Sequence, residues 1–169
     1  MKIDFELRKW DREFADDLAI HANNKNIAAN LRDAFPHPYT KKDAKDYIAH
    51  CIANEGRTQI CRAIYVNDEA VGSVGIFVGE DVYRKSAEIG YWLSEKYWDR
   101  GIMSQAVKSI CEKAFERFDI VRIYAEPFYD NTPSRKVLDN AGFSLEGVMM
   151  NGVYKNDQIK DYCMYALIR

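Results

Sequence analysis

The folds open to this chain are limited most by an amphipathic helix predicted at 102–118 and by the short apolar strand at 87–93 that leads into it. The apolar side chains of the helix recur at intervals of three and one, which keeps them on a single face of a helix with 3.6 residues per turn. They are Met103, Ala106, Val107, Ile110, Cys111, Ala114, Phe115 and Phe118. A helix with one apolar face, joined to a strand by a short loop, predicts a helix packed against a sheet.

The loop before this helix, Trp98-Asp99-Arg100-Gly101, has features of an anion site. The first turn of a helix presents free backbone N–H groups and the positive end of the helix dipole. Gly101 has no Cβ, so a ligand can approach the backbone closely, and Lys96 and Arg100 add positive charge nearby. A phosphate fits such a helix start. On these residues alone, an ordinary strand-to-helix connection is the alternative.

Two familiar phosphate loops are absent from the sequence. No G-x-x-x-x-G-K-[ST] pattern occurs, which excludes a Walker-type nucleotide site. The spacing of Gly72, Gly75 and Gly79 is not that of G-x-G-x-x-G, and no predicted helix follows them. A dinucleotide site of that kind is therefore excluded as well.

The length and composition predict one globular domain spanning residues 1–169. Hydrophobic residues make up 47% of the chain, and the net charge of −2 gives no reason to expect nucleic acid as a partner. No apolar run approaches the ~20 residues that a membrane span needs. The opening MKIDFELRKW alternates like a strand and lacks the apolar segment of a secretion signal. We therefore expect a cytoplasmic protein with no membrane partner.

The cysteines and histidines show no pattern of metal ligands, so we predict no metal. The cysteines lie far apart, form no C-x-x-C pair and mostly occupy apolar segments, where a buried reduced thiol is the usual role. They are Cys51, Cys61, Cys111 and Cys163, and the histidines are His21, His37 and His50.

The other segments predict strands interrupted by helices. A strand is expected at 3–7 and helices at 11–21 and 23–31. Phe35-Pro36-His37-Pro38-Tyr39 excludes regular structure, and Thr40 with Asp43 predicts a capped helix start. A further helix is expected at 131–141, and further strands at 59–66, 70–78, 120–128, 143–151 and 158–168. The first two of these strands should form a hairpin around Asn67-Asp68-Glu69. Most pairs should be antiparallel, but 87–93 and 120–128 should run parallel because a helix links them.

Four blocks, in this order, resemble the GNAT superfamily of N-acetyltransferases. They are EIGYWL, WDRGIMSQA, the N-x-x-S-x-x-V-L-x-x-x-G-F pattern that begins at Asn131, and LEG. More narrowly, the chain looks like the branch of ribosomal-protein-alanine N-acetyltransferases, the RimJ/RimL type. The resemblance implies an α+β fold with helices on both faces of a single mixed, mostly antiparallel sheet of about six or seven strands. That sheet is splayed between two central parallel strands.

The resemblance also implies acetyl-coenzyme A (acetyl-CoA) as the acetyl donor and coenzyme A (CoA) as a product. In the family the pyrophosphate lies on the N–H groups that begin the long helix, and the pantetheine arm lies beside the preceding strand. Both placements are physically reasonable, because a helix start suits a diphosphate and an amide-bearing arm pairs with an exposed strand edge. The implied binding residues are Tyr91, Trp92, Leu93, Trp98, Asp99, Arg100, Gly101, Ile102, Met103, Ser104, Asn131 and Ser134.

The usual acid and base positions of the family are changed in this chain. Leu138 stands where many members carry a tyrosine acid, and Val153 stands where the branch carries a carboxylate. Ser134 is therefore the candidate proton donor to the thiolate, with a helix residue bonded to the backbone as the alternative. Glu88 is the candidate base, with an edge carboxylate paired to Arg or Lys as the alternative. Glu126 is a weaker candidate for the base.

We expect the amine to attack directly in a ternary complex. An α-amino group with a pKa of about 8 loses its proton readily, and positioning supplies much of the rate. A backbone N–H of Trp92 or Leu93 is expected to face the oxyanion. The acceptor is a protein N-terminus or a small primary amine. Its pocket is expected to be lined by Phe35, His37, Tyr39, Tyr83 and Tyr154, unless these rings belong to the core.

Two other functions stay open at this point. The first is a CoA-binding regulatory or interaction module without turnover, which the changes at Leu138 and Val153 favour. The second is acetylation of a polyamine or an aminoglycoside, for which a dense acidic run would be expected and is not found. The protein is expected to be a monomer or a homodimer.

Overall fold

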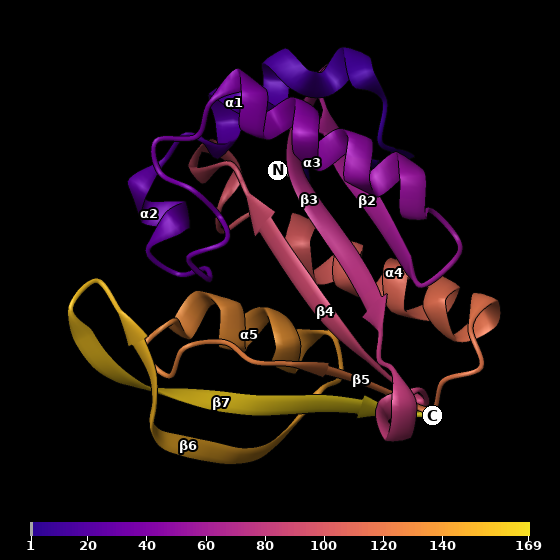
Figure 1. Cartoon of the computed structure of the whole chain (residues 1–169), viewed down its shortest axis with the longest axis vertical. Coiled ribbons are helices and arrows are strands. Elements are labelled where there is room, and N and C mark those ends of the chain that lie inside the picture. Colours follow the sequence, from indigo (N-terminus) through magenta and orange to yellow (C-terminus); the bar gives the residue numbers. More distant parts are fainter. Residues whose placement is uncertain (1) are drawn as a thin grey trace.

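The computed structural model describes residues 2–169, in which seven strands form one sheet in the order β1-β2-β3-β4-β5-β7-β6 (Figure 1). The strands are β1 (Glu6–Lys9), β2 (Gln59–Val66), β3 (Glu69–Val78), β4 (Ser86–Leu93), β5 (Arg122–Ala125), β6 (Ser144–Lys155) and β7 (Gln158–Ile168). The α-helices are α1 (Ala15–Ala22), α2 (Lys25–Ala28), α3 (Lys41–Asn54), α4 (Ile102–Arg117) and α5 (Thr132–Asn140), and the 3-10 turns are η1 (Arg12–Phe14), η2 (Asp81–Tyr83) and η3 (Glu95–Tyr97).

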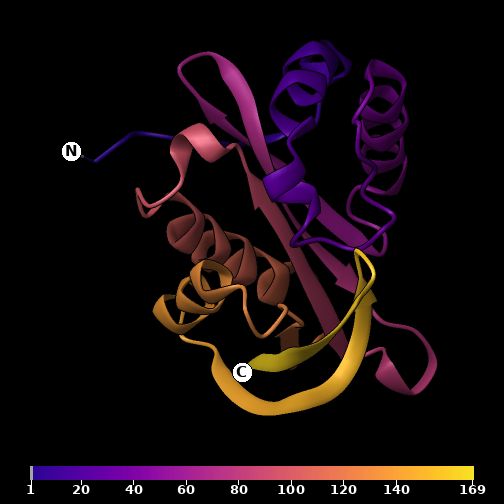
Figure 2. The same cartoon turned by 90° about the vertical axis from the view of Figure 1, so that its left-hand side faces the viewer.

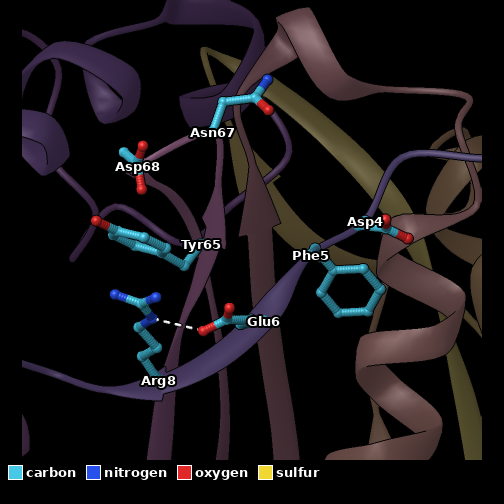
Figure 3. A pocket seen from close by; sticks show the side chains of 7 residues that line it. All are labelled: Asp4, Phe5, Glu6, Arg8, Tyr65, Asn67 and Asp68. Carbon is cyan, nitrogen blue, oxygen red and sulfur yellow. Dashed lines mark hydrogen bonds and ion pairs between the residues drawn. The ribbon is translucent and has the colours of Figure 1, made fainter.

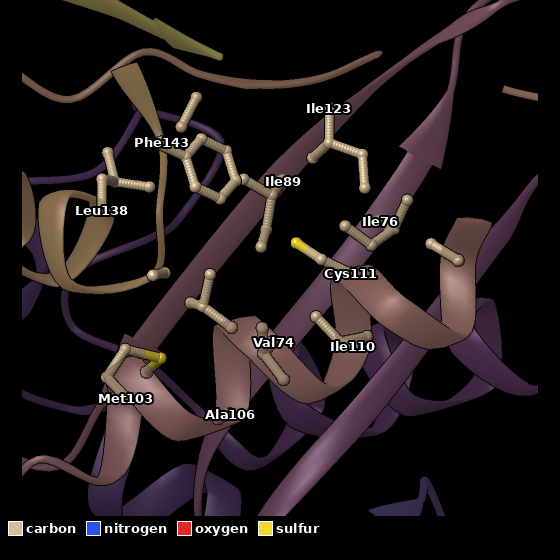
Figure 4. Close-up of a cluster of buried hydrophobic side chains, with 14 of the residues drawn as sticks. Val74, Ile76, Ile89, Met103, Ala106, Ile110, Cys111, Ile123, Leu138 and Phe143 are labelled. Carbon is tan, nitrogen blue, oxygen red and sulfur yellow. The ribbon is translucent and has the colours of Figure 1, made fainter. Parts of the chain in front are cut away.

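The predicted mixed sheet is confirmed. Among the paired strands, β4 and β5 run parallel and the other pairs are antiparallel. Helices α1 and α3 cover one face, and α4 and α5 cover the other (Figure 2). Side chains alternate along a strand, so β4 directs Ile89 and Leu93 into the core under α4 and Trp92 into the core under α1 and α3. Figure 4 shows part of the α4 side, where Ile110 and Cys111 meet side chains of β3.

Several elements begin or end where local sequence signals predicted. Thr40 and Asp43 form both bonds of a capping box at the start of α3. Asn67 and Asp68 have φ of 49° and 65°, as a two-residue hairpin turn between β2 and β3 requires. The helix predicted at 102–118 is α4, whose apolar face is buried.

Three strands differ from the prediction by more than one residue. The first strand was expected at 3–7 but begins at Glu6, where it pairs with Tyr65. The strand expected at 120–128 is only Arg122–Ala125, because its pairing with β4 ends at Tyr124 and Pro127 has no N–H to donate. The strand expected at 143–151 extends to Lys155, so β6 and β7 form a long hairpin closed by a two-residue turn.

The sheet opens between β4 and β5. Parallel pairing stops after Glu88 and Tyr124. Beyond that point β4 continues along β3, whereas the chain after β5 follows β7: the N–H of Cys163 donates to the Pro127 carbonyl at 2.8 Å. We call this separation the split; in Figure 1 the two strands diverge from it. The second half of β4 consequently has one edge that no strand of the described chain covers.

Candidate active site

The backbone of β4 presents particular N–H groups to the split. Its ends are fixed on β3 by bonds from Ser94 N to Val71 O and from Gly79 N to Ser86 O, both 2.8 Å. Antiparallel bonding alternates along a strand, so the even-numbered residues of β4 point their N–H groups at β3 and the odd-numbered residues point away. Of the two oxyanion donors considered from the sequence, Leu93 therefore faces the split and Trp92 faces β3. The Leu93 carbonyl accepts from the Trp98 indole at 2.7 Å.

The start of α4 is exposed next to this strand. Gly101 precedes the helix with a left-handed φ of 74°, no side chain within residues 2–169 caps it, and no acidic residue lies in its first turn. A Cβ built on Gly101 would meet nothing within 4 Å, so the space before the helix is open. The side chains of Ile102 and Met103 are buried, and only their backbone N–H groups can serve a ligand. These features fit a diphosphate.

On the same face of β4, Tyr91 meets the first turn of α5. Its hydroxyl lies 2.9 Å from Ser134 Oγ and donates to the Ser134 carbonyl at 3.3 Å. Asn131 caps α5, because its Oδ1 accepts from Ser134 N at 3.3 Å. The cap uses only the oxygen of Asn131, so its amide N–H₂ can still serve a ligand.

Glu88 lies on the opposite face of β4 from Tyr91 and Ser134, on the side of α1 and α3. It is paired with an arginine, as the alternative interpretation of its role allowed. Arg32, in the segment between α2 and α3, contacts Glu88 through both Nη atoms and Glu126 through Nη2, at 2.9 Å from Oε2. A single guanidinium group therefore joins carboxylates from the two sides of the split. Burial acts to lower the pKa of Arg32, but the two carboxylates outweigh it, and the pKa is raised.

The aromatic residues predicted to line an acceptor pocket are only partly brought together. The ring centroid of Phe35 lies 5.0 Å from that of Tyr39 and 5.8 Å from that of Trp92, on the face that carries Glu88. His37 is exposed on the same segment. Tyr154 is exposed near the turn of the β6–β7 hairpin, where its hydroxyl donates to Asp157 at 3.0 Å. Tyr83 is exposed in η2, which precedes β4 and lies away from the split.

Arg32 is the residue of this site that sequence reasoning missed. It lies 56 positions from Glu88 and 94 from Glu126, outside the four blocks that carried the resemblance, so no local pattern marked it. Of the two changed positions, Leu138 is a fully buried residue of α5 and Val153 lies on β6.

Polar contacts also fix the loop between β4 and α4. Ser94 is buried, and its Oγ lies 3.0 Å from Nδ1 of His21 in α1. Glu95 accepts from Asn24 Nδ2 at 2.7 Å and from Asn26. These bonds attach the segment α1–α2 to the loop that leads into α4.

Other parts of the described chain show fewer features of a binding site. A surface pocket of about 150 Å³ lies against β1, where Arg8 Nε donates to Glu6 at 2.8 Å (Figure 3). It is separated from the split by β2 and β3. Residues 2–169 contain no group of three His, Cys, Asp or Glu side chains arranged to hold a metal ion. None of the described helices is long and apolar enough to cross a membrane.

This sheet, with its split and its exposed helix start, is the architecture of an N-acetyltransferase. A solved structure of RimL, the ribosomal L7/L12 alpha-N-protein acetyltransferase, in complex with CoA matches it with a TM-score of 0.86 and 28% identity, over 97% of this chain and 93% of the other. The chain belongs to the acetyltransferase (GNAT) domain family, whose model matches residues 4–144.

Two further relatives agree with this assignment. An uncharacterized N-acetyltransferase, p20 of Bacillus licheniformis, is 28% identical over 96% of this chain and 92% of its own length. A Salmonella typhimurium acetyltransferase that modifies the N-terminal serine of ribosomal protein L7/L12 matches with a TM-score of 0.82 and 27% identity, over 98% of this chain and 95% of that one. The resemblance to the RimJ/RimL type, inferred from four short blocks, is confirmed.

Proposed function

We propose that this protein transfers the acetyl group of acetyl-CoA to a primary amine, and that the amine attacks directly at the split. One observation carries the proposal: the split has an open, uncapped helix start on one face of β4 and a carboxylate pair on the other. A donor that binds at the helix and an amine that binds at the carboxylates meet between the strands. Family membership supports this chemistry.

The donor would lie along β4. The N–H groups of residues 102–104 would hold the pyrophosphate, and the odd-numbered edge of β4 would pair with the amides of the pantetheine arm. The N–H₂ group of Asn131 would donate to a carbonyl of the same arm. Each of these groups belongs to the backbone or to a side chain already fixed by packing, so little order is lost on binding.

The transfer needs three groups of the protein. Glu88 takes the proton that the attacking amine loses. The N–H of Leu93 donates to the oxygen that becomes negative as the C–N bond forms. Ser134 gives its proton to the sulfur as the C–S bond breaks and regains a proton from solvent, while the Tyr91 hydroxyl, 2.9 Å away, holds the Ser134 side chain in position. Glu88 and Ser134 lie on opposite faces of β4, so base and acid approach the reacting carbon from opposite sides.

The acceptor is proposed to be a protein N-terminus. The support comes from relatives, among them the enzyme that modifies the N-terminal serine of L7/L12. A small primary amine, such as a polyamine or an aminoglycoside, is the alternative acceptor. The cytoplasmic location, the single-domain organisation and the choice between monomer and homodimer stay predictions.

The test is release of CoA thiol from acetyl-CoA in the presence of an amine panel. The panel contains peptides that begin with serine or alanine, the same peptides with a blocked N-terminus, spermidine and an aminoglycoside. We expect turnover with a free N-terminus and none with its blocked form. Turnover with spermidine or the aminoglycoside alone would assign a small-molecule acceptor. Tight CoA binding without turnover on any amine would leave a CoA-binding module and overturn the proposal.

A further inference from the structure

We propose that Arg32 occupies the place of the acceptor's ammonium group in the free protein and yields it when the acceptor binds. Arg32 would then be an internal competitor that sets acceptor affinity. This inference deepens the proposed function, because it concerns how the amine enters the same site.

The position of the guanidinium group is that of an arriving amine. Glu88 and Tyr124 are the last paired residues before β4 and β5 separate, and Glu126 lies two positions further along the same face. Arg32 bridges Glu88 and Glu126 there, with Nη2 in contact with both. An amine that gives its proton to Glu88 must reach this point, and a primary ammonium has N–H donors for both carboxylates.

Arg32 is much more exposed to solvent than the two carboxylates that it bridges. The Arg32 side chain is 66% exposed, whereas the Glu88 and Glu126 side chains are 26% and 25% exposed. The carboxylates are held by the strands, and the long arginine side chain can swing into solvent through rotamer changes alone. An ion pair with so exposed a partner contributes little to stability.

The segment that carries Arg32 has a separate anchor. The buried Tyr39 donates its backbone N–H to Asn23 Oδ1 at 3.0 Å, and the Phe35 ring packs against Trp92 with ring centroids 5.8 Å apart. These contacts hold the 29–40 segment in place without Arg32. The Arg32 side chain can therefore leave the carboxylates while its backbone stays in place.

Replacing the Arg32 guanidinium with the acceptor's ammonium also keeps the net charge between the two carboxylates unchanged. Without a cation, two carboxylates that share one guanidinium would repel each other. Replacing the guanidinium with an ammonium keeps one positive charge between them, and after the amine gives up its proton, that proton neutralises one carboxylate. The site thus selects an acceptor that arrives as a cation, as a protein N-terminus with a pKa near ~8 does at neutral pH.

A binding experiment tests the exchange without turnover. The probe is ethylammonium chloride, titrated at constant ionic strength into protein with ¹³C-labelled glutamate carboxyls, whose signals are assigned with Glu88→Gln and Glu126→Gln. If Arg32 holds the site about nine-tenths of the time, Arg32→Met should lower the Kd reported by both carboxyls about tenfold. Arg8→Met removes another exposed, carboxylate-paired arginine, on β1, and should leave the Kd unchanged. Equal Kd values in wild type and Arg32→Met would overturn the inference.

Kinetics separate this inference from the proposed function. With the best amine of the panel, Arg32→Met should lower KM without lowering kcat, and Arg32→Gln serves as a second variant if the first folds poorly. Guanidinium chloride should inhibit Arg32→Met in competition with the amine and affect wild type much less. A fall in kcat with unchanged KM, restored by guanidinium, would instead make Arg32 a fixed positioning group and overturn the exchange. If wild type acetylates no amine, the proposed function fails, and the titration still decides the exchange.

Discussion

The hydroxyl of Tyr91 lies 2.9 Å from Ser134 Oγ, a contact that joins β4 to the first turn of α5 on the face where α4 begins. Burial raises the pKa of the Tyr91 phenol, so it stays protonated and remains a hydrogen-bonding partner of Ser134. In the proposed reaction, Ser134 passes its proton to the departing sulfur and Tyr91 supports it. The two residues come from different blocks of the sequence, and the contact became visible only in the fold.

Ser134→Ala should lower kcat about 10- to 100-fold and leave CoA affinity nearly unchanged. The effect should be at the low end for a general acid, because a thiolate with a pKa of about 8.5 leaves readily. Tyr91→Phe keeps the ring and removes one hydrogen bond of ~1 kcal/mol, so kcat should fall about fivefold. Steady-state kinetics and CoA calorimetry measure both quantities. Normal kcat in Ser134→Ala would leave Ser134 as a helix residue only.

Two substitutions at Asn131 should separate its cap from its contact with the donor. Asn131→Asp keeps an N-cap oxygen but removes the N–H₂ donor, so stability should hold and CoA affinity should fall by about 1 kcal/mol. Asn131→Ala should lose both, with about 1 kcal/mol of stability as well. Thermal unfolding and calorimetry on the two variants provide the comparison. Unchanged CoA affinity in Asn131→Asp would limit Asn131 to capping.

Gly101→Asn should weaken CoA binding tenfold or more, about 1.4 kcal/mol. Gly101→Val is a poor test, because a β-branched residue is strained at φ 74°. Asn tolerates this conformation, and its side chain would extend into the open space before α4. Gly56→Asn is the matched control, with φ of 73° in the loop after α3 and only the flexible Arg117 side chain close to a new Cβ. Both variants should unfold near the wild-type temperature. If Gly101→Asn binds CoA as tightly as wild type does, the pyrophosphate does not bind at this loop.

Local patterns in the sequence predicted the fold well where one short segment carried the information. The stripe of α4, the Thr40–Asp43 capping box and the Asn67-Asp68 turn each depend on neighbours within a few residues. The end of β5 did not follow from such a pattern. Its apolar sequence continues, but after Tyr124 the chain loses β4 as a partner and keeps only β7, and the loss of a partner strand depends on the whole sheet.

The sequence predicted the donor side of the candidate site more completely than the acceptor side. The blocks around Gly101 and Ser134 marked the donor side, because a helix start and a cap have local signatures. The acceptor side depends on Arg32, and its long-range contacts with Glu88 and Glu126 have no counterpart in the sequence pattern. Alternation along β4 puts Glu88 on the face of Trp92, but it could not show what pairs with Glu88. Tyr83 was grouped with that face on residue type alone, and the fold sets it apart.

Glu88→Gln should change how the rate depends on pH. If Glu88 is the base, the variant can use only amine that is already neutral, so kcat/KM should fall about tenfold per pH unit below the amine's pKa of about 8. Wild type should fall less steeply over the same range, since Glu88 can take the proton within the complex. Glu126→Gln is the comparison that keeps Glu88 and removes the second carboxylate. If kcat/KM depends on pH in the same way in wild type and Glu88→Gln, the amine loses its proton before it binds and Glu88 is not the base.

Mass spectrometry after incubation with acetyl-CoA alone should detect no acetylated cysteine. A covalent route needs an accessible thiolate with a base beside it, and all the cysteines are buried. Burial raises the pKa of the Cys111 thiol to about 12 and also raises the pKa of Cys163. Neither thiol is a nucleophile near neutral pH.

Cys51 and Cys61 test the same prediction more severely, because the pKa of one of them is lowered. A hydrogen bond from the Cys61 thiol lowers the pKa of Cys51, while that of Cys61 is raised by the same contact and by burial. Both lie in the core under α3, in contact with Tyr47 rather than with Glu88 or the split. Cys51→Ala should therefore keep wild-type turnover. An acetyl group found on Cys51 in stoichiometric amount, and passed to an amine on addition, would replace direct attack with a two-step mechanism.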